Sequence, residues 1–67
     1  MYKALSSKDI IKILEKNRFI FKSKKGSHTK YISQNKTVIV PHPKSFIPNG
    51  TFLSIVRQSG LKKEDFY

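Results

Sequence analysis

The sequence of 67 residues contains no cysteine, no tryptophan and only four acidic residues. Without cysteine, disulfide bonds and thiolate zinc sites are both excluded, and the composition fits a reducing cytoplasm. No apolar run approaches the ~18 residues that a membrane-spanning helix needs. Residues 1–7 also lack the hydrophobic region of a signal peptide. We therefore expect a cytoplasmic protein with no membrane partner.

The length limits the number of folding units. A chain of 67 residues is about half the usual domain length, so we expect a single domain over residues 1–67. A domain of this size buries only roughly 60% of the surface that its unfolded chain exposes. The core must then be thin, and the free energy of unfolding only a few kcal/mol.

The few acids are confined to the two ends of the sequence. They are Asp9, Glu15, Glu64 and Asp65, so residues 16–63 are free of acids while they carry eleven of the fourteen lysines and arginines. The formal net charge is +10. A surface of this charge favours a polyanionic partner that releases counterions on binding. No segment joins basic residues to a large apolar helix face, so nucleic acid is favoured over lipid.

Helices are expected near both ends of the sequence. Ser6 or Ser7 can cap the first helix, Asp9 suits its first turn, and the apolar residues that follow have helical spacing: Ile10, Ile11, Ile13 and Leu14. A turn at residues 48–50 is expected to lead into a second helix from about Thr51, which Gly60 closes. A last short turn should direct two apolar residues to the core and two acids to water, namely Leu61 and Phe66, and Glu64 and Asp65.

Between the helices, three segments have the period of two that is typical of strands. They are expected at residues 18–22, 28–32 and 37–40, with turns at residues 24–27 and 33–36. The third strand ends at Pro41, because proline has no amide hydrogen for a central strand. The order α-β-β-β-α predicts an α+β fold in which a three-stranded antiparallel sheet has both helices on one face. The predicted core includes Phe19, Phe21, Phe52 and Ile55.

The other face of this sheet is expected to be open and basic around His28. Strand polarity places near it the side chains of Lys22, Lys24, Lys25 and Lys30. A metal ion is disfavoured, because the site has no carboxylate or cysteine, and we expect no cofactor. RNA suits the site, since its 2′-hydroxyl is a nucleophile beside the phosphate. A histidine can move the proton, and ammonium groups can stabilise the charge on the phosphate oxygens.

Three blocks of residues follow one another along the chain. They are Gly26-Ser27-His28-x-Lys30-Tyr31, Val38-x-Val40-Pro41 and Gly50-Thr51-x-x-Ser54-Ile55-x-Arg57-Gln58-x-Gly60-Leu61. Together they span nearly the whole chain and resemble HicA-type mRNA interferase toxins. The resemblance implies a fold similar to the double-stranded RNA-binding domain, metal-independent endoribonuclease activity on mRNA, and a HicB antitoxin protein as partner.

The resemblance also implies roles for single residues. His28 becomes the catalytic residue, and Gly26 and Ser27 form the turn before it, where the backbone can approach a phosphate. The cations expected to bind RNA are Lys22, Lys24, Lys25 and Lys30. Two departures from the family pattern stand out: Phe52-Leu53 replaces a common leucine-arginine pair, and Thr29 occupies a position that sometimes holds a second histidine.

For several residues, the sequence leaves two roles open. His42 lies between two prolines, and a structural or solvent-exposed role is favoured over that of general acid. Tyr31 is favoured as a sheet-packing aromatic over a base-stacking one. Phe46 and Ile47 either cover the core or form a patch that the antitoxin buries. For the whole protein, the alternatives are a non-catalytic module that binds double-stranded RNA by shape and a subunit whose basic face docks an acidic protein.

Overall fold

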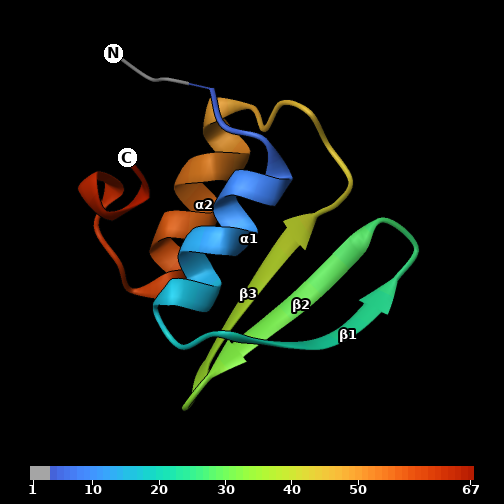
Figure 1. Cartoon of the computed structure of the whole chain (residues 1–67), viewed down its shortest axis with the longest axis vertical. Helices are drawn as coiled ribbons and strands as arrows, with labels where there is room; N and C mark the ends of the chain where they lie inside the picture. Colours follow the sequence, from blue (N-terminus) through green and yellow to red (C-terminus); the bar gives the residue numbers. More distant parts are fainter. Residues whose placement is uncertain (1–3) are drawn as a thin grey trace.

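The computed structural model describes residues 4–67 of the chain. The elements are α1 (Ser7–Lys16), β1 (Ile20–Lys25), β2 (His28–Ser33), β3 (Lys36–Pro41), α2 (Asn49–Ser59) and the short 3-10 helix η1 (Lys63–Phe66). The three strands form one antiparallel sheet in the order β1-β2-β3, and the two helices lie side by side next to β3 (Figure 1). The predicted α+β fold with the order α-β-β-β-α is confirmed.

Helix α1 begins where the sequence predicts. The Ser6 side chain accepts a hydrogen bond from the Asp9 amide at 3.1 Å, and the Asp9 carboxylate accepts one from the Ser6 amide at 3.4 Å. This reciprocal capping box satisfies two amides that the first helical turn leaves unpaired. Ile10 and Leu14 are fully buried one turn apart, so α1 presents a single apolar face to the core.

Helix α2 begins two residues earlier than predicted. Pro48 is its N-cap, and Asn49 and Gly50 belong to the first turn instead of a preceding turn. Propensity favours a turn at this sequence, but a helix boundary taken from sequence is uncertain by about two residues. Gly60 closes the helix with φ +73°, as predicted. The positive φ is what favours glycine here, because the atoms nearest to a Cβ at this position belong to the flexible end of the Lys36 side chain, which can move aside.

The first strand lies further along the chain than predicted. Residues 17–19 connect α1 to β1, and Arg18 adopts φ +71° where the chain leaves the helix. Lys24 and Lys25 end the strand, so the turn is only Gly26 and Ser27. The sequence gives no sign of this shift, because a positive φ is unusual for an arginine.

The core lies between the helices and one face of β2 and β3. Val38, Val40, Phe52 and Ile55 are at most 1% exposed. Strand β1 is the edge furthest from the helices (Figure 1), and every one of its residues is exposed. Phe21, predicted in the core, is therefore 54% exposed and packs edge-on against Tyr31 at 5.8 Å between ring centroids.

The remaining apolar residues with a predicted role differ in burial. Ile47 is fully buried, while Phe46 next to it is 54% exposed. Phe66 of η1 is 1% exposed and packs edge-on against Phe52, and Leu61 is partly buried against the same core, as predicted. Within residues 4–67, neither helix has the length and apolar character that crossing a bilayer requires.

Candidate active site

His28 is the first residue of β2 and is exposed on the face of the sheet opposite the helices. Its neighbours in β2 alternate: Thr29 and Tyr31 are buried beneath the helices, so His28 and Lys30 project from the other face. The Cα partners of His28 are Lys25 on β1 and Pro41 on β3. The imidazole therefore lies at one end of an uncovered sheet face, open to a large ligand.

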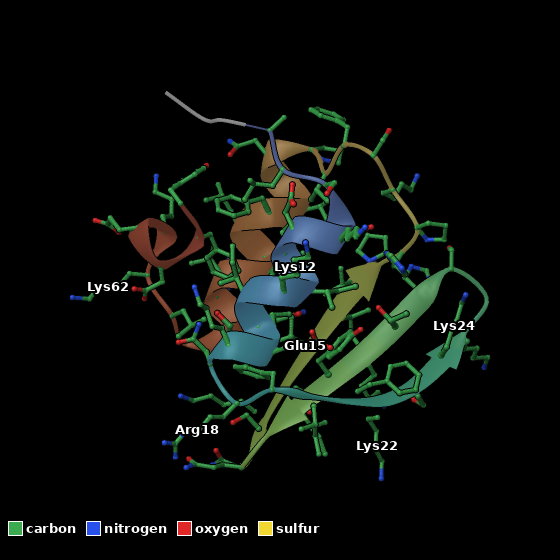
Figure 2. All side chains as sticks on the ribbon, viewed as in Figure 1. Lys12, Glu15, Arg18, Lys22, Lys24 and Lys62 are labelled. Carbon is green, nitrogen blue, oxygen red and sulfur yellow. The ribbon has the colours of Figure 1, made fainter. Side chains whose placement is uncertain are left out.

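The four predicted lysines divide between two faces of the sheet. Lys25 pairs with His28, and Lys30 lies two residues further along β2, so both share the open face with the histidine. Lys24 pairs with the buried Thr29 and so belongs to the helix-side face at the uncovered edge. Lys22 occupies a bulge between two pairs of the β1-β2 register and points away from the sheet edge (Figure 2). The prediction that all four surround His28 on or beside the open face is correct for Lys25 and Lys30; Lys24 and Lys22 lie elsewhere.

The turn before His28 consists of Gly26 and Ser27. Gly26 has φ +59°, whereas Ser27 has no positive φ. This combination is typical of two-residue hairpin turns in which the first residue has a positive φ and is usually glycine. A Cβ atom at Gly26 would meet nothing within 4 Å. The glycine is thus required by its backbone conformation, and the space around the turn is open.

His42 makes two contacts that support the structural role favoured from the sequence. Its Nδ1 atom lies 2.7 Å from Oγ of Ser7, and its backbone amide donates to the Ser27 carbonyl at 2.7 Å. Because Pro41 shares the open face with His28, His42 is directed to the helix side. The two histidines therefore lie on opposite sides of the sheet end. The sequence predicts only a capping role for Ser7, because no local pattern connects residues that are 35 positions apart.

Tyr31 is a packing residue, as favoured from the sequence. Its side chain is 6% exposed on the helix side. Burial raises the pKa of Tyr31 above its usual value, and the negative charge of Glu15 raises it further. Glu15 lies on the side of α1 next to the sheet (Figure 2). The phenol therefore stays neutral at physiological pH and is turned away from a ligand on the open face.

Positive side chains are not restricted to the surroundings of His28. Arg18 and Lys62 project from the opposite side of the molecule to Lys24, and Lys12 lies on the outer surface of α1 (Figure 2). Among residues 4–67, no group of three or more histidines, aspartates or glutamates could hold a metal ion. Positive charge alone therefore does not distinguish the surroundings of His28. The distinguishing feature is the combination of an exposed histidine, a glycine turn and two lysines on one face.

Comparison with known proteins decides the family. The family model for the HicA toxin of bacterial toxin–antitoxin systems matches residues 7–61. The chain belongs to the HicA toxin family. Among curated proteins, no significant match is found.

Membership of the HicA family makes the chain a toxin of a toxin–antitoxin system and implies an antitoxin as its partner. The matched region contains every element from α1 to α2, including the His28 turn. The residues that depart from the family pattern differ in environment: Phe52 and Thr29 are buried, and Leu53 is 40% exposed. Arg57, one turn after Leu53, is exposed on the same helix.

Proposed function

We propose that this HicA toxin is a metal-independent endoribonuclease that cleaves mRNA in the cytoplasm. The observation that carries the proposal is the exposed His28 at the end of an uncovered sheet face, with Lys25 and Lys30 on the same face. In this proposal His28 is the catalytic residue. Gly26, Ser27 and the lysines bind the RNA backbone, with Lys22 and Lys24 extending the cationic surface around the β1 edge.

The chemistry needs one movable proton on the protein. A ring nitrogen of His28 takes the proton of the ribose 2′-hydroxyl, and the O2′ atom attacks the adjacent phosphorus. The bond from phosphorus to O5′ breaks, the leaving oxygen takes a proton from water, and the hydroxide that remains takes the proton from the His28 imidazolium. The products are an upstream fragment with a 2′,3′-cyclic phosphate and a downstream fragment with a 5′-hydroxyl. Positioned proton transfer of this kind contributes roughly 10²–10⁴-fold to the rate.

The lysines supply the electrostatic part. As the attack proceeds, negative charge accumulates on the non-bridging phosphate oxygens, and fixed cations lower the energy of that state more than the energy of the bound substrate. Lys25 pairs with His28 across the β1-β2 register, so its ammonium group can reach a phosphate held at the imidazole. Lys30 lies one pleat further along the same face and suits the next phosphate.

The test compares RNA with DNA of the same sequence in excess chelator. We expect cleavage of the RNA, a cyclic phosphate on the upstream product by mass spectrometry, and no cleavage of the DNA. An RNA with a single 2′-deoxy nucleotide at the cleaved position should be cut at least about 100-fold more slowly, because it lacks the nucleophile. Cleavage of the deoxy substrate at the rate of the all-ribose RNA, or cleavage that requires a divalent ion, would contradict the proposal.

The same experiment separates the enzyme from the alternative module. A non-catalytic protein that binds double-stranded RNA by shape would retain RNA in a mobility-shift assay and leave it intact. That result would assign the basic surface to binding alone, over a footprint of about 16 base pairs.

We further propose that a HicB-type antitoxin covers the open face and blocks His28. Besides the cations, this face carries isoleucines in register: Ile20 pairs with Ile32, and Ile39 pairs with Lys30. Ile20 is 62% exposed. A protein partner can bury these side chains and offer carboxylates to Lys25 and Lys30, whereas RNA contacts mainly the cationic end.

Chemical modification tests this arrangement. In the free toxin, diethyl pyrocarbonate should modify His28 readily, since its ring is exposed. In the complex with the protein from the adjacent gene, the modification of His28 should slow by at least about tenfold, as measured by peptide mass spectrometry. An equal rate at His28 in the free toxin and in an inhibited complex would show that the antitoxin acts from another surface.

A further inference from the structure

Ser7 joins α1 to the segment after β3 through one buried hydroxyl group. Its side chain is 1% exposed. The Oγ atom accepts a hydrogen bond from the Lys44 amide at 2.9 Å, and it lies 3.1 Å from the Lys44 carbonyl and 2.7 Å from Nδ1 of His42. The Ser7 amide donates to the same carbonyl at 2.9 Å. The first turn of α1 is thereby fixed to the segment that follows β3.

His42 carries this attachment to the His28 turn. Its backbone amide donates to the Ser27 carbonyl at 2.7 Å, one step beyond the pair formed by His28 and Pro41. Ser27 directly precedes His28, so the backbone entering the catalytic position is held from β3 as well as from β1. Among the hydrogen bonds of residues 4–67, none holds the imidazole of His28 itself, so the placement of this residue depends on the backbone of its turn.

We propose that the Ser7–His42 hydrogen bond is a positioning device for His28, and that His42 acts through the backbone and not by proton transfer. The proposal rests on the proposed function for its effect on cleavage, but its structural part is independent of it. Without the bond, His42 would lose its side-chain attachment to α1, although the backbone bond between Ser7 and Lys44 would remain, and the donor to the Ser27 carbonyl would be held less firmly. Misplacement of a catalytic group by about 1 Å can cost up to roughly 10²-fold in rate.

The hydrogen bond is compatible with either protonation state of His42. If Nδ1 carries a hydrogen, it donates to Oγ of Ser7, whose own hydrogen can turn to the Lys44 carbonyl. If Nδ1 is bare, the hydroxyl donates to it instead. Since serine both donates and accepts, the contact persists in both states. A positioning role therefore predicts that a substitution of His42 leaves the pH profile of cleavage in place.

The chain offers a matched control in Ser59. This serine is also 1% exposed, donates to the Val56 carbonyl at 2.8 Å and accepts from the Leu61 amide at 3.1 Å. It lies at the end of α2, whereas the His28 turn contacts β3 and the segment after it. Ser59→Ala should thus lower the free energy of unfolding about as much as Ser7→Ala does, without disturbing the active site.

The test combines amide exchange with kinetics. In Ser7→Ala, hydrogen exchange at the residue 42 amide should be at least about tenfold faster than in wild type, measured by NMR. The kcat for RNA cleavage should fall roughly tenfold with KM little changed. Ser59→Ala should change neither. His42→Asn, whose amide can replace Nδ1, should retain most of kcat, and His42→Ala should lose it, both with an unshifted pH profile.

Each outcome decides the proposal. Equal exchange at residue 42 in Ser7→Ala, Ser59→Ala and wild type would overturn it, as would loss of one limb of the pH profile in His42→Asn, which would make His42 an acid–base group. If Ser7→Ala does not fold, His42→Ala removes the same bond from a half-buried position and is measured in its place. If wild type cleaves no RNA, the proposed function fails, and the exchange comparison still decides whether the bond orders the turn.

Discussion

Replacing His28 with alanine is expected to lower the rate of RNA cleavage by at least about 100-fold, which is the smaller end of what positioned proton transfer contributes. RNA binding should remain, because Lys25 and Lys30 keep their charge and position on the open face. Since His28 is exposed, the free energy of unfolding should change by no more than about 0.5 kcal/mol. Single-turnover cleavage, a mobility-shift assay and circular dichroism measure these three quantities.

Thr37→Ala provides the control for His28→Ala. Thr37 is also exposed and pairs with Ile32 on the open face, but it lies at the other end of the sheet from His28. The Thr37→Ala variant should cleave RNA at a rate within about twofold of wild type. The histidine hypothesis fails if His28→Ala still cleaves RNA at the wild-type rate, or if Thr37→Ala is equally impaired, since the whole face would then be sensitive to any truncation.

The parts of the fold that were predicted correctly depend on local chemistry. A serine before an acidic first turn specifies the start of α1, and a glycine at the end of an apolar periodic segment specifies the end of α2. His28 in its glycine turn was likewise visible, because residues 26–28 are contiguous. In each case, the residues that cause the feature are within four positions of one another.

The incorrect predictions concern relations between distant elements. Alternation predicted Phe21 in the core, but it could not show that the helices stop short of β1. The bulge at Lys22 shifts the phase of the strand, so alternation counted from Phe21 could not show that Lys25, and not Lys24, shares the face of His28. The contact of Ser7 with His42 is set by packing of α1 against the end of β3, which no local pattern encodes.

Phe52→Ala should have the largest effect on stability of any substitution in the core. Phe52 is fully buried and packs edge-on against Phe66, with ring centroids 5.4 Å apart. Truncation of a buried phenylalanine costs about 3–5 kcal/mol. A core of this size supplies little more than that in total. We therefore expect the variant to be largely unfolded at 25 °C, with loss of the helical circular-dichroism signal and of cooperative urea unfolding.

Phe21→Ala is the matched comparison, because it removes the same atoms from a different environment. Phe21 is 54% exposed on the edge strand, and its ring packs edge-on against Tyr31 with ring centroids 5.8 Å apart. Its truncation should cost less than about 1 kcal/mol, mainly from the lost ring contact. If Phe52→Ala and Phe21→Ala had the same urea midpoint, burial beneath the helices would not determine the free energy of unfolding. The exposed Phe21 side chain on β1 would then have to be buried in solution by another molecule. A large separation of the midpoints instead assigns the stability of the fold to the helix side of the sheet and leaves the open face free for a ligand.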